Sequence, residues 1–245
     1  MGSTGNSMRH AWRVDVLMRG GATRASSVLA RRGSDVAIFD TGLAQHTAAF
    51  VAALAEEGLS VNDVTLVFNT HAHVDHSHNN ALFPGARIFF SARDRQWTHD
   101  FHQALASAEY PDAETIAAFY PELAGSGVSP KVTRKIAGIE KLLWDPARWG
   151  RGDQAAHLES TPLPPGIALI ETPGHSPWHA SFAITTLDRA VLVCGDALVL
   201  RDEDAYAAPM MPPWSTGRYA ESQAIIRAFD GLIVPGHDDP FENHP

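Results

Sequence analysis

The segment from His71 to His76 places four side chains of the metal-binding kind within six residues. It reads His-Ala-His-Val-Asp-His and follows an apolar run at 64–68 whose β-branched and aromatic residues predict a buried strand. In extended backbone His71 and His73 project to the same side and can hold one ion, while Asp75 and His76 lie past the turn. The spacing therefore indicates a site for two neighbouring metal ions.

Later in the chain, three more predicted strands are each followed by a side chain of the metal-binding kind. A lone His-x-His pair is often only a surface feature, so this recurrence matters. Apolar runs at 167–170, 191–194 and 232–234 each end at a turn residue, and the side chains delivered there are His175, Asp196 and His237. Because strand ends meet at the rim of a sheet, these side chains are expected to join the first four.

The order of these residues resembles the metallo-β-lactamase superfamily, and the similarity extends from about Val28 to His237, including the Phe-Asp-Thr-Gly segment that begins at Phe39. The resemblance implies an α/β fold, an αββα sandwich of the metallo-β-lactamase type with a helical insertion. It also implies a ligand set: one metal held by His71, His73 and His175, a second held by Asp75, His76 and His237, Asp196 bridging both, and Asp40 supporting the ligand loop without binding metal.

The chemistry implied by this resemblance is hydrolysis by a hydroxide shared between two ions. Metal binding lowers the pKa of water from ~15.7 to about 7, so the nucleophile forms at neutral pH. Asp75 is the candidate catalytic residue, orienting that nucleophile and relaying its proton. Two zinc ions are expected, although the same nitrogen and oxygen ligands also suit iron or manganese.

Departures from known branches narrow the expected substrate. Most class B β-lactamases differ at the position of Asp196 or in the Asp-His pair, and acyl-homoserine lactonases carry a Tyr where this chain has Val199. Because eight residues follow His237 in this sequence, the helical substrate domain of glyoxalase II-like members and the flavin domain of flavodiiron-type members are not expected. The favoured activity is hydrolysis of an ester, lactone or thioester of a small organic molecule.

Two alternatives remain open at this stage. The segment 76–86 is similar to small, nuclease-like members of the superfamily, which keeps a phosphodiesterase or ribonuclease as the second hypothesis. A non-catalytic metal-binding or sensor protein is the third, and the complete ligand set argues against it.

Other elements must position these residues. Strands are predicted at 36–39, 64–68 and 88–90 and a helix within 42–58. An insertion at about 92–160 is helical and aromatic, and it either caps the site or simply buries its aromatic side chains against the sheet. Its aromatic residues are Trp97, Phe101, Tyr110, Phe119, Tyr120, Trp144 and Trp149. The candidate substrate contacts are Trp97 in this insertion and Tyr206, Met210 and Trp214 in a second apolar segment.

Length and composition fit such an enzyme. The 245 residues carry a formal net charge of -9, which disfavours nucleic acid as a partner and favours a small-molecule substrate. Residues 1–7 resemble an expression scar, and 8–245 are expected to form a single domain. The single cysteine permits no intrachain disulfide, and no apolar stretch approaches the ~18 residues of a membrane span. A cytoplasmic protein without membrane contact is expected, with a homodimer possible through the aromatic insertion.

Overall fold

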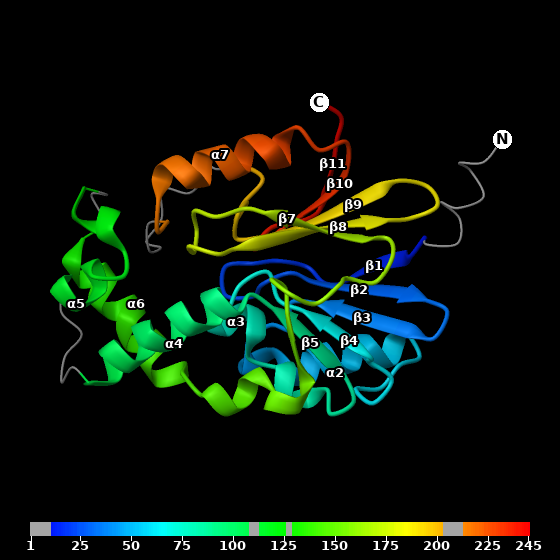
Figure 1. Cartoon of the computed structure of the whole chain (residues 1–245), viewed down its shortest axis with the longest axis horizontal. Helices are drawn as coiled ribbons and strands as arrows, with labels where there is room; N and C mark the ends of the chain where they lie inside the picture. Colours follow the sequence, from blue (N-terminus) through cyan, green and yellow to red (C-terminus); the bar gives the residue numbers. More distant parts are fainter. Residues whose placement is uncertain (1–10, 108–112, 126–128, 203–212) are drawn as a thin grey trace.

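Two β-sheets lie face to face in the computed structural model, with helices on their outer sides (Figure 1). The structure describes residues 11–107, 113–125, 129–202 and 213–245. Within those residues the layers run helix, sheet, sheet, helix, which confirms the αββα sandwich predicted from the sequence.

The first sheet has the strand order β1-β2-β3-β4-β5-β6. β1, β2 and β3 pair antiparallel, and β3 to β6 pair parallel. The parallel strands carry their carboxyl ends to one edge, which is where Asp40 and the His71 segment emerge. The strands are β1 (Arg13–Met18), β2 (Ser27–Arg32), β3 (Asp35–Phe39), β4 (Leu66–Phe68), β5 (Arg87–Phe90) and β6 (Ala155–His157).

The second sheet has the order β11-β10-β9-β8-β7. Its central pair, β9 and β10, is parallel, while the other pairs are antiparallel. β9 and β10 therefore deliver Asp196 and His237 to the same edge of the sheet. The strands are β7 (Ile167–Glu171), β8 (Ala180–Thr185), β9 (Ala190–Gly195), β10 (Gly231–Pro235) and β11 (Phe241–Asn243).

Helices cover both sheets. Phe50 and Leu54 of α2 pack against the first sheet, and Ile226 of α7 packs against the second. The remaining longer helices extend from one end of the sandwich (Figure 1). The α-helices are α2 (Thr47–Glu56), α3 (Val74–Ser77), α4 (Ala92–Ser107), α5 (Ala113–Ala117), α6 (Pro130–Leu143) and α7 (Thr216–Arg227). The 3-10 turns are η1 (Ala44–His46), η2 (Asn80–Leu82), η3 (Pro121–Gly125), η4 (Pro146–Trp149) and η5 (Gly152–Gln154).

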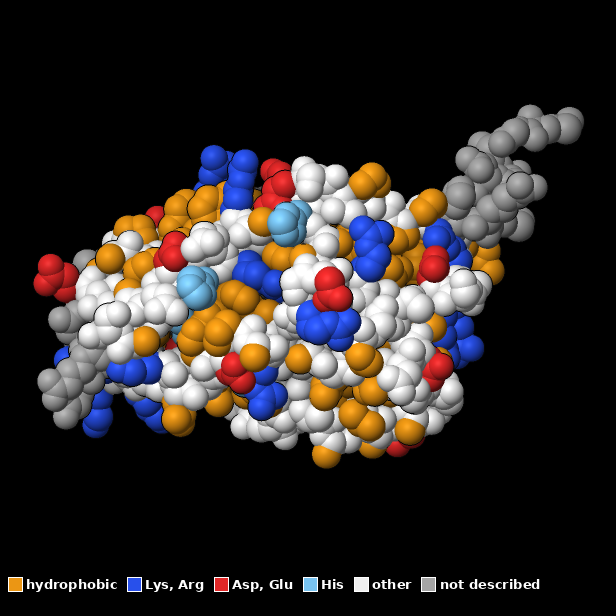
Figure 2. Space-filling view, turned by 60° about the horizontal axis from the view of Figure 1, so that its bottom comes forward, with side chains coloured by type: hydrophobic (Ala, Val, Ile, Leu, Met, Phe, Trp, Pro, Cys, Tyr) orange, Lys and Arg blue, Asp and Glu red, His pale blue; other side chains and the backbone are white. Residues whose placement is uncertain are grey.

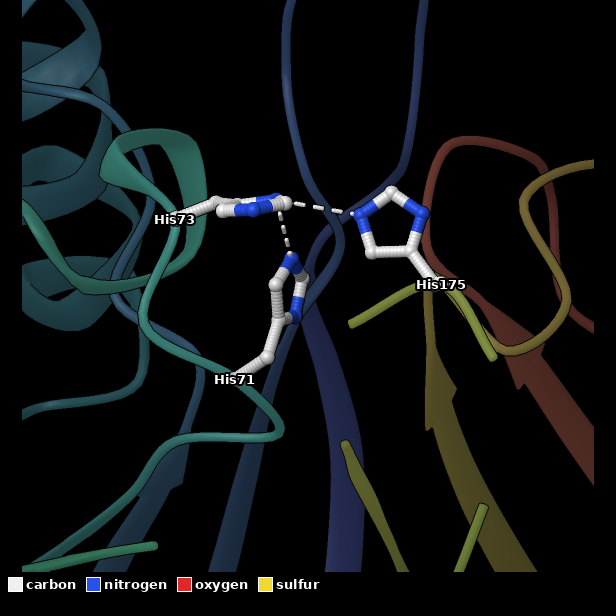
Figure 3. Close-up of side chains that lie close together, drawn as sticks. All are labelled: His71, His73 and His175. Carbon is white, nitrogen blue, oxygen red and sulfur yellow. Dashed lines mark hydrogen bonds between the residues drawn. The ribbon is translucent and has the colours of Figure 1, made fainter. Parts of the chain in front are cut away.

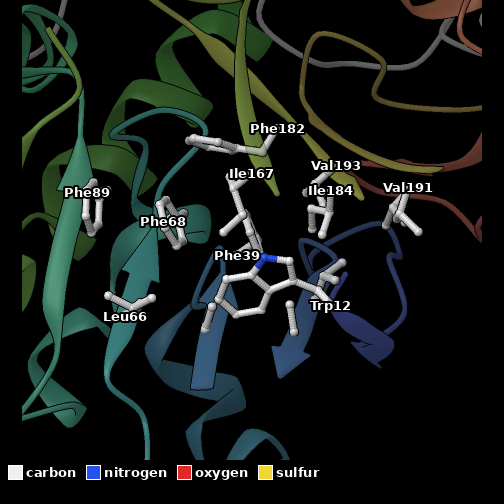
Figure 4. Packing of buried hydrophobic residues seen from close by; sticks show 14 of the residues in the cluster. Trp12, Phe39, Leu66, Phe68, Phe89, Ile167, Phe182, Ile184, Val191 and Val193 are labelled. Carbon is white, nitrogen blue, oxygen red and sulfur yellow. The ribbon is translucent and has the colours of Figure 1, made fainter. Parts of the chain in front are cut away.

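The space between the sheets is filled by stacked phenylalanine rings (Figure 4). Three neighbouring parallel strands carry a phenylalanine at the same register position: Phe39, Phe68 and Phe89. The Phe68 ring stacks between the other two, with its centroid 4.8 Å from that of Phe39 and 4.6 Å from that of Phe89. Phe182 of the facing sheet meets the Phe68 ring edge-on at 5.4 Å. The residues before these rings, such as Val67, face α2 instead, because side chains alternate along a strand. This core fixes the strand ends that carry the site.

We expect Phe68→Ala to lower the free energy of unfolding by about 3–5 kcal/mol, since the ring is fully buried and a cavity would remain. Urea denaturation monitored by circular dichroism measures the change. Phe241→Ala, in the partly exposed strand β11, is the matched control and should cost less. A loss below about 1 kcal/mol for Phe68→Ala would contradict the central role of this ring.

The sequence-based elements agree with the structure except at three places. The predicted strand 64–68 is shortened to Leu66–Phe68, and the predicted helix within 42–58 is α2 preceded by a 3-10 turn. The helical stretch after β5 ends at Gln154, because Ala155–His157 forms strand β6 beside β5. Three residues with two alanines give no strand pattern in sequence, so pairing with β5 decides this element. Among the described residues no helix is long and apolar enough to cross a membrane.

Candidate metal centre

Seven side chains converge at one end of the sandwich. The loop after β4 and the short helix α3 supply His71, His73, Asp75 and His76. The turns after β7, β9 and β10 supply His175, Asp196 and His237. The structure thus brings together all seven residues expected from the sequence, in three overlapping groups whose candidate ligand atoms lie within 4.8 Å of one another.

The first group consists of three imidazoles that point toward one another (Figure 3). Nδ1 of His73 lies 3.1 Å from Nε2 of His71 and 3.0 Å from Nε2 of His175. Three ring nitrogens converging in this way can share a single cation, because each neutral imidazole can present a lone pair to it.

The second group consists of Asp75, His76 and His237. Oδ2 of Asp75 lies 3.3 Å from Nε2 of His237 and 3.9 Å from Nε2 of His76. Asp75 is the more accessible of the two carboxylates in the centre, with 29% of its side chain exposed against 4% for Asp196. Asp75 is therefore the carboxylate of the centre that is more accessible to solvent.

Asp196 stands between the two groups. Its Oδ2 lies 3.5 Å from Nε2 of His175, in the first group. Its Oδ1 lies 3.1 Å from Nε2 of His76 and 3.5 Å from Nε2 of His237, in the second group. One carboxylate thus presents a separate oxygen to each group, which is one of the ways in which a carboxylate can bridge two ions.

The ring nitrogens that point away from the centre test whether it fits metal ions, and four of the five have the partner expected of a metal ligand, while Nδ1 of His175 has none among the described residues. Metal-binding histidines generally donate this second N–H to an oxygen, which fixes the ring. Nδ1 of His76 lies 2.8 Å from Asp40 and Nδ1 of His237 lies 3.0 Å from the Gly21 carbonyl. The far nitrogens of His71 and His73 face the hydroxyls of Thr70 and Tyr120, both at 3.1 Å. In contrast, the inward atoms His76 Nε2, His237 Nε2 and Asp196 Oδ1 are buried and have no hydrogen-bond partner among the described residues.

Asp40 lies beneath the ligand loop, as the sequence predicts. Its Oδ1 accepts a hydrogen bond from Thr70 N, and its Oδ2 accepts from the Thr70 hydroxyl and from His76 Nδ1, each at 2.8 Å. The backbone at Asp40 has φ +53°, a left-handed conformation that few non-glycine residues adopt. The carboxylate thus ties β3 to the strand and loop that carry the ligands.

Gly236 is required by close approach to the centre. A Cβ atom there would overlap Oδ1 of Asp196, so any other residue would displace the bridging carboxylate. Gly195 has φ +51°, and a Cβ there would overlap the Thr70 side chain. The glycines that end these strands are therefore part of the site's geometry.

The protonation of the centre suits cation binding. Burial lowers the pKa of His71, His73 and His175, that of His175 to about 3, so these rings keep a free lone pair at neutral pH. Burial also lowers the pKa of His237, but the negative charges of Asp196 and Asp75 have a larger effect. They raise the pKa of His237 to about 9. A bound cation would replace the proton that the carboxylates hold there.

Asp94 of α4 is a supporting residue that was not predicted from the sequence. It is buried, and its two oxygens accept from Ala72 N at 2.8 Å and from the Ser176 hydroxyl at 2.5 Å. It therefore joins the loop of His71 and His73 to the loop of His175. An Asp in the first turn of a helix commonly stabilises that helix, so its sequence context alone indicates nothing more.

The structure places two of the four predicted substrate contacts, Trp97 and Trp214, beside the first group. The Trp97 ring lies 6.3 Å from that of His73, and Trp214 N donates to the His175 carbonyl at 3.2 Å, so both adjoin the first group. Tyr206 and Met210 lie outside the described residues. Four aromatic residues of the insertion, Trp97, Phe101, Phe119 and Tyr120, pack in one cluster together with Trp214.

Glu140 of α6 is a further titratable group in the insertion. Its Oε2 lies 3.4 Å from Nε2 of His102, a buried ring stacked 4.1 Å from Trp144, and no hydrogen bond satisfies that oxygen among the described residues. Burial raises the pKa of Glu140 to about 8, and the negative charge of Asp75 adds to this. Glu140 is therefore predominantly protonated at pH 7.

This raised pKa predicts a pH-dependent stability for the metal-free protein. Between pH 4.5 and 8 the unfolded chain loses the Glu140 proton while the folded chain keeps it, so the free energy of unfolding falls as pH rises. Glu140→Gln should remove this decrease. At pH 8.5 its free energy of unfolding should exceed that of the wild type by on the order of 2 kcal/mol, and at pH 4 the two should differ little. Urea denaturation at both pH values measures it. Glu114→Gln on the exposed side of α5 is the control, and parallel pH profiles for wild type and Glu140→Gln would contradict the prediction.

Comparison with known proteins agrees with this geometry. The family model of the metallo-beta-lactamase superfamily matches residues 20–237. The chain belongs to the metallo-beta-lactamase superfamily.

The individual relatives described below share less than a third of their aligned residues with this chain. Human metallo-beta-lactamase domain-containing protein 1 is 28% identical over 224 residues, which cover 90% of this chain and 65% of the human protein. The mouse protein of the same name is 29% identical, and the match covers 83% of this chain and 60% of that protein. The chain thus spans somewhat less than two thirds of the length of these curated relatives.

Solved structures share the fold. A metallo-beta-lactamase family protein of Thermus thermophilus superposes with a TM-score of 0.62 at 21% identity, covering 94% of this chain and 75% of that one. AidC, a dizinc quorum-quenching lactonase, superposes with a TM-score of 0.59 at 16% identity, covering 83% of this chain and 67% of AidC. Members of the superfamily are metal-dependent hydrolases, typically with two metal ions, and this chain has candidate ligands for both.

Proposed function

We propose that this protein hydrolyses an ester, lactone or thioester bond of a small organic molecule, using two zinc ions held by the seven converging side chains. The observation that carries the proposal is Asp196, whose two oxygens face the two ligand groups separately. His71, His73 and His175 would hold one ion, Asp75, His76 and His237 the other, and Asp196 both. Once bound, the ions would polarise the substrate carbonyl and lower the pKa of water at the site.

The chain's own residues then have distinct roles. Asp75 is the accessible carboxylate of the centre, so it is placed to accept and pass on a proton of the attacking water. Asp40 holds the His76 ring through Nδ1, and Asp94 holds the first ligand loop against the His175 loop. Trp97 and Trp214, beside the first group, would exclude water from the apolar part of a substrate.

Surface charge favours a small molecule over nucleic acid. The net charge of -9 repels phosphate backbones. On the face seen in Figure 2, acidic side chains are interspersed among the Lys and Arg side chains, and several basic ones gather at the lower left. The lactonase activity named for AidC supports the carbonyl substrate class proposed for this chain.

A substrate panel tests the proposal. Purified protein loaded with zinc, iron or manganese is assayed on aryl esters, lactones, thioesters and bis-p-nitrophenyl phosphate, with metal content determined in parallel. Metal-dependent turnover of a carbonyl substrate is expected, with about two ions per chain. Turnover of the phosphodiester alone would favour the phosphodiesterase alternative, and well under one ion per chain would contradict the metal centre.

A further inference from the structure

The helical insertion reaches the metal centre through the phenol of Tyr120. Its hydroxyl lies 3.1 Å from Nε2 of His73, and only 3% of the residue is exposed. The Tyr120 ring meets the rings of Trp97 and Phe101 nearly edge-on, at 5.3 and 5.4 Å. The hydroxyl is therefore held in place by a packed aromatic cluster.

The direction of this hydrogen bond follows from the arrangement of the first group. Nδ1 of His73 faces His71 and His175, so it is the atom that would bind the cation and it must carry a lone pair. A neutral imidazole with a free Nδ1 has its proton on Nε2. Nε2–H of His73 therefore donates to the Tyr120 oxygen, and this contact fixes both the tautomer and the orientation of the ring.

The same segment also supports the loop of His175. Glu122, two residues after Tyr120, accepts a hydrogen bond from Thr216 N at 2.7 Å, at the start of α7. Immediately before it, Trp214 N and Ser215 N donate to the carbonyls of His175 and Gly174 at 3.2 and 3.0 Å. The insertion thus supports two of the three histidines of the first group, His73 directly and His175 through residues 214–216.

The second group is held by different parts of the chain. The His76 ring is fixed by Asp40 at the end of β3, and the His237 ring by the Gly21 carbonyl between β1 and β2. These anchors belong to the sandwich rather than to the insertion.

We propose that Tyr120 is a positioning residue that couples the helical insertion to one of the two cation sites, the one formed by His71, His73 and His175. This inference rests on the proposed two-metal centre. Removing the Tyr120 hydroxyl weakens cation binding at that site and leaves the site of Asp75, His76 and His237 intact. By linkage, a cation in the first site stabilises the insertion in turn.

Zinc binding by single-site variants tests the proposal. His237→Ala removes a ligand of the second site alone, and His175→Ala removes a ligand of the first site alone. Tyr120→Phe is introduced into each background, and zinc affinity is measured by competition with a chromophoric chelator. In the His237→Ala background we expect a loss of roughly 10- to 100-fold, as for other groups that orient a ligand. In the His175→Ala background the affinity should change by less than about threefold.

Phe119→Leu is the matched packing control. Phe119 contacts the rings of Trp97 and Phe101 in the same cluster but makes no ring contact with His73 among the described residues. It should leave the zinc affinity of both backgrounds unchanged. An equal loss in both backgrounds, no loss in either, or a loss with Phe119→Leu as large as with Tyr120→Phe would overturn the proposal.

Nuclear magnetic resonance of folded wild type gives a second measurement that does not depend on the variants. With ¹⁵N-labelled histidine and bound zinc, His73 should show the tautomer protonated at Nε2, and the opposite tautomer would overturn the proposal. Neither measurement uses hydrolysis. A selective zinc effect with no turnover of any substrate therefore contradicts the proposed function while supporting the role of Tyr120.

Discussion

Replacing Asp196 by Asn is expected to lower kcat/KM by about 10³-fold or more on whichever substrate the panel identifies. Asn keeps the shape of the side chain but loses the charge, and its amide nitrogen cannot ligate a cation in the way a carboxylate oxygen does. The two groups that Asp196 joins would then hold their ions less tightly and at altered positions. Charge stabilisation at a reacting centre is among the largest contributions to catalysis, which sets the size of the effect.

The matched control is Asp188→Asn. Asp188 is exposed in the turn between β8 and β9, far along the sheet from the strand ends that bear the site, and its loss should leave turnover unchanged. Metal content measured on both variants separates loss of ions from loss of activity with ions bound. Retention of activity within tenfold in Asp196→Asn would contradict the bridging role.

Removal of metal is expected to lower the free energy of unfolding by about 5–8 kcal/mol, if each of two sites is held at 100 to 1,000 times its dissociation constant. The effect is large because the centre gathers five imidazoles and the carboxylates of Asp75 and Asp196 in a buried space, where cations neutralise charge and satisfy inward-facing atoms.

Urea denaturation of chelator-treated protein, with and without a fixed free zinc concentration, measures this difference. Asp196→Asn should show a clearly smaller difference than wild type, because it lacks the shared ligand. His244→Ala, which changes an exposed histidine near the end of the chain, should behave as wild type. Equal stability with and without zinc would contradict a bound metal pair.

The strands that lead to the later ligands could be predicted because their apolar runs, at 167–170, 191–194 and 232–234, are each followed within a few residues by Gly or Pro. An apolar run of this kind buries both of its faces only as a strand inside a sheet that is covered on both sides. The residue that follows it then lies where the strand ends, at the rim of the sheet. The seven candidate ligands therefore followed from local pattern together with resemblance, and the structure brings them within reach of one another. The very short strand β6 did not follow, because its pairing partner rather than its own sequence determines it.

The supporting residues could not be predicted in the same way. Asp94 lies in a helix and Tyr120 in an aromatic segment, and nothing within a few positions of either distinguishes it from an ordinary helix-stabilising acid or a core tyrosine. Their roles depend on contacts with residues 22 and 47 positions away in the chain.

The sequence by itself determined the kinds of atoms available for chemistry and the edge of the sheet to which each strand delivers them, because periodicity and turn residues act over a few neighbouring positions. Only the tertiary structure decided which nitrogen of each imidazole faces inward, and which residue holds the outward nitrogen of four of them. Those choices come from packing between distant segments, with Asp40 behind His76 and Tyr120 behind His73.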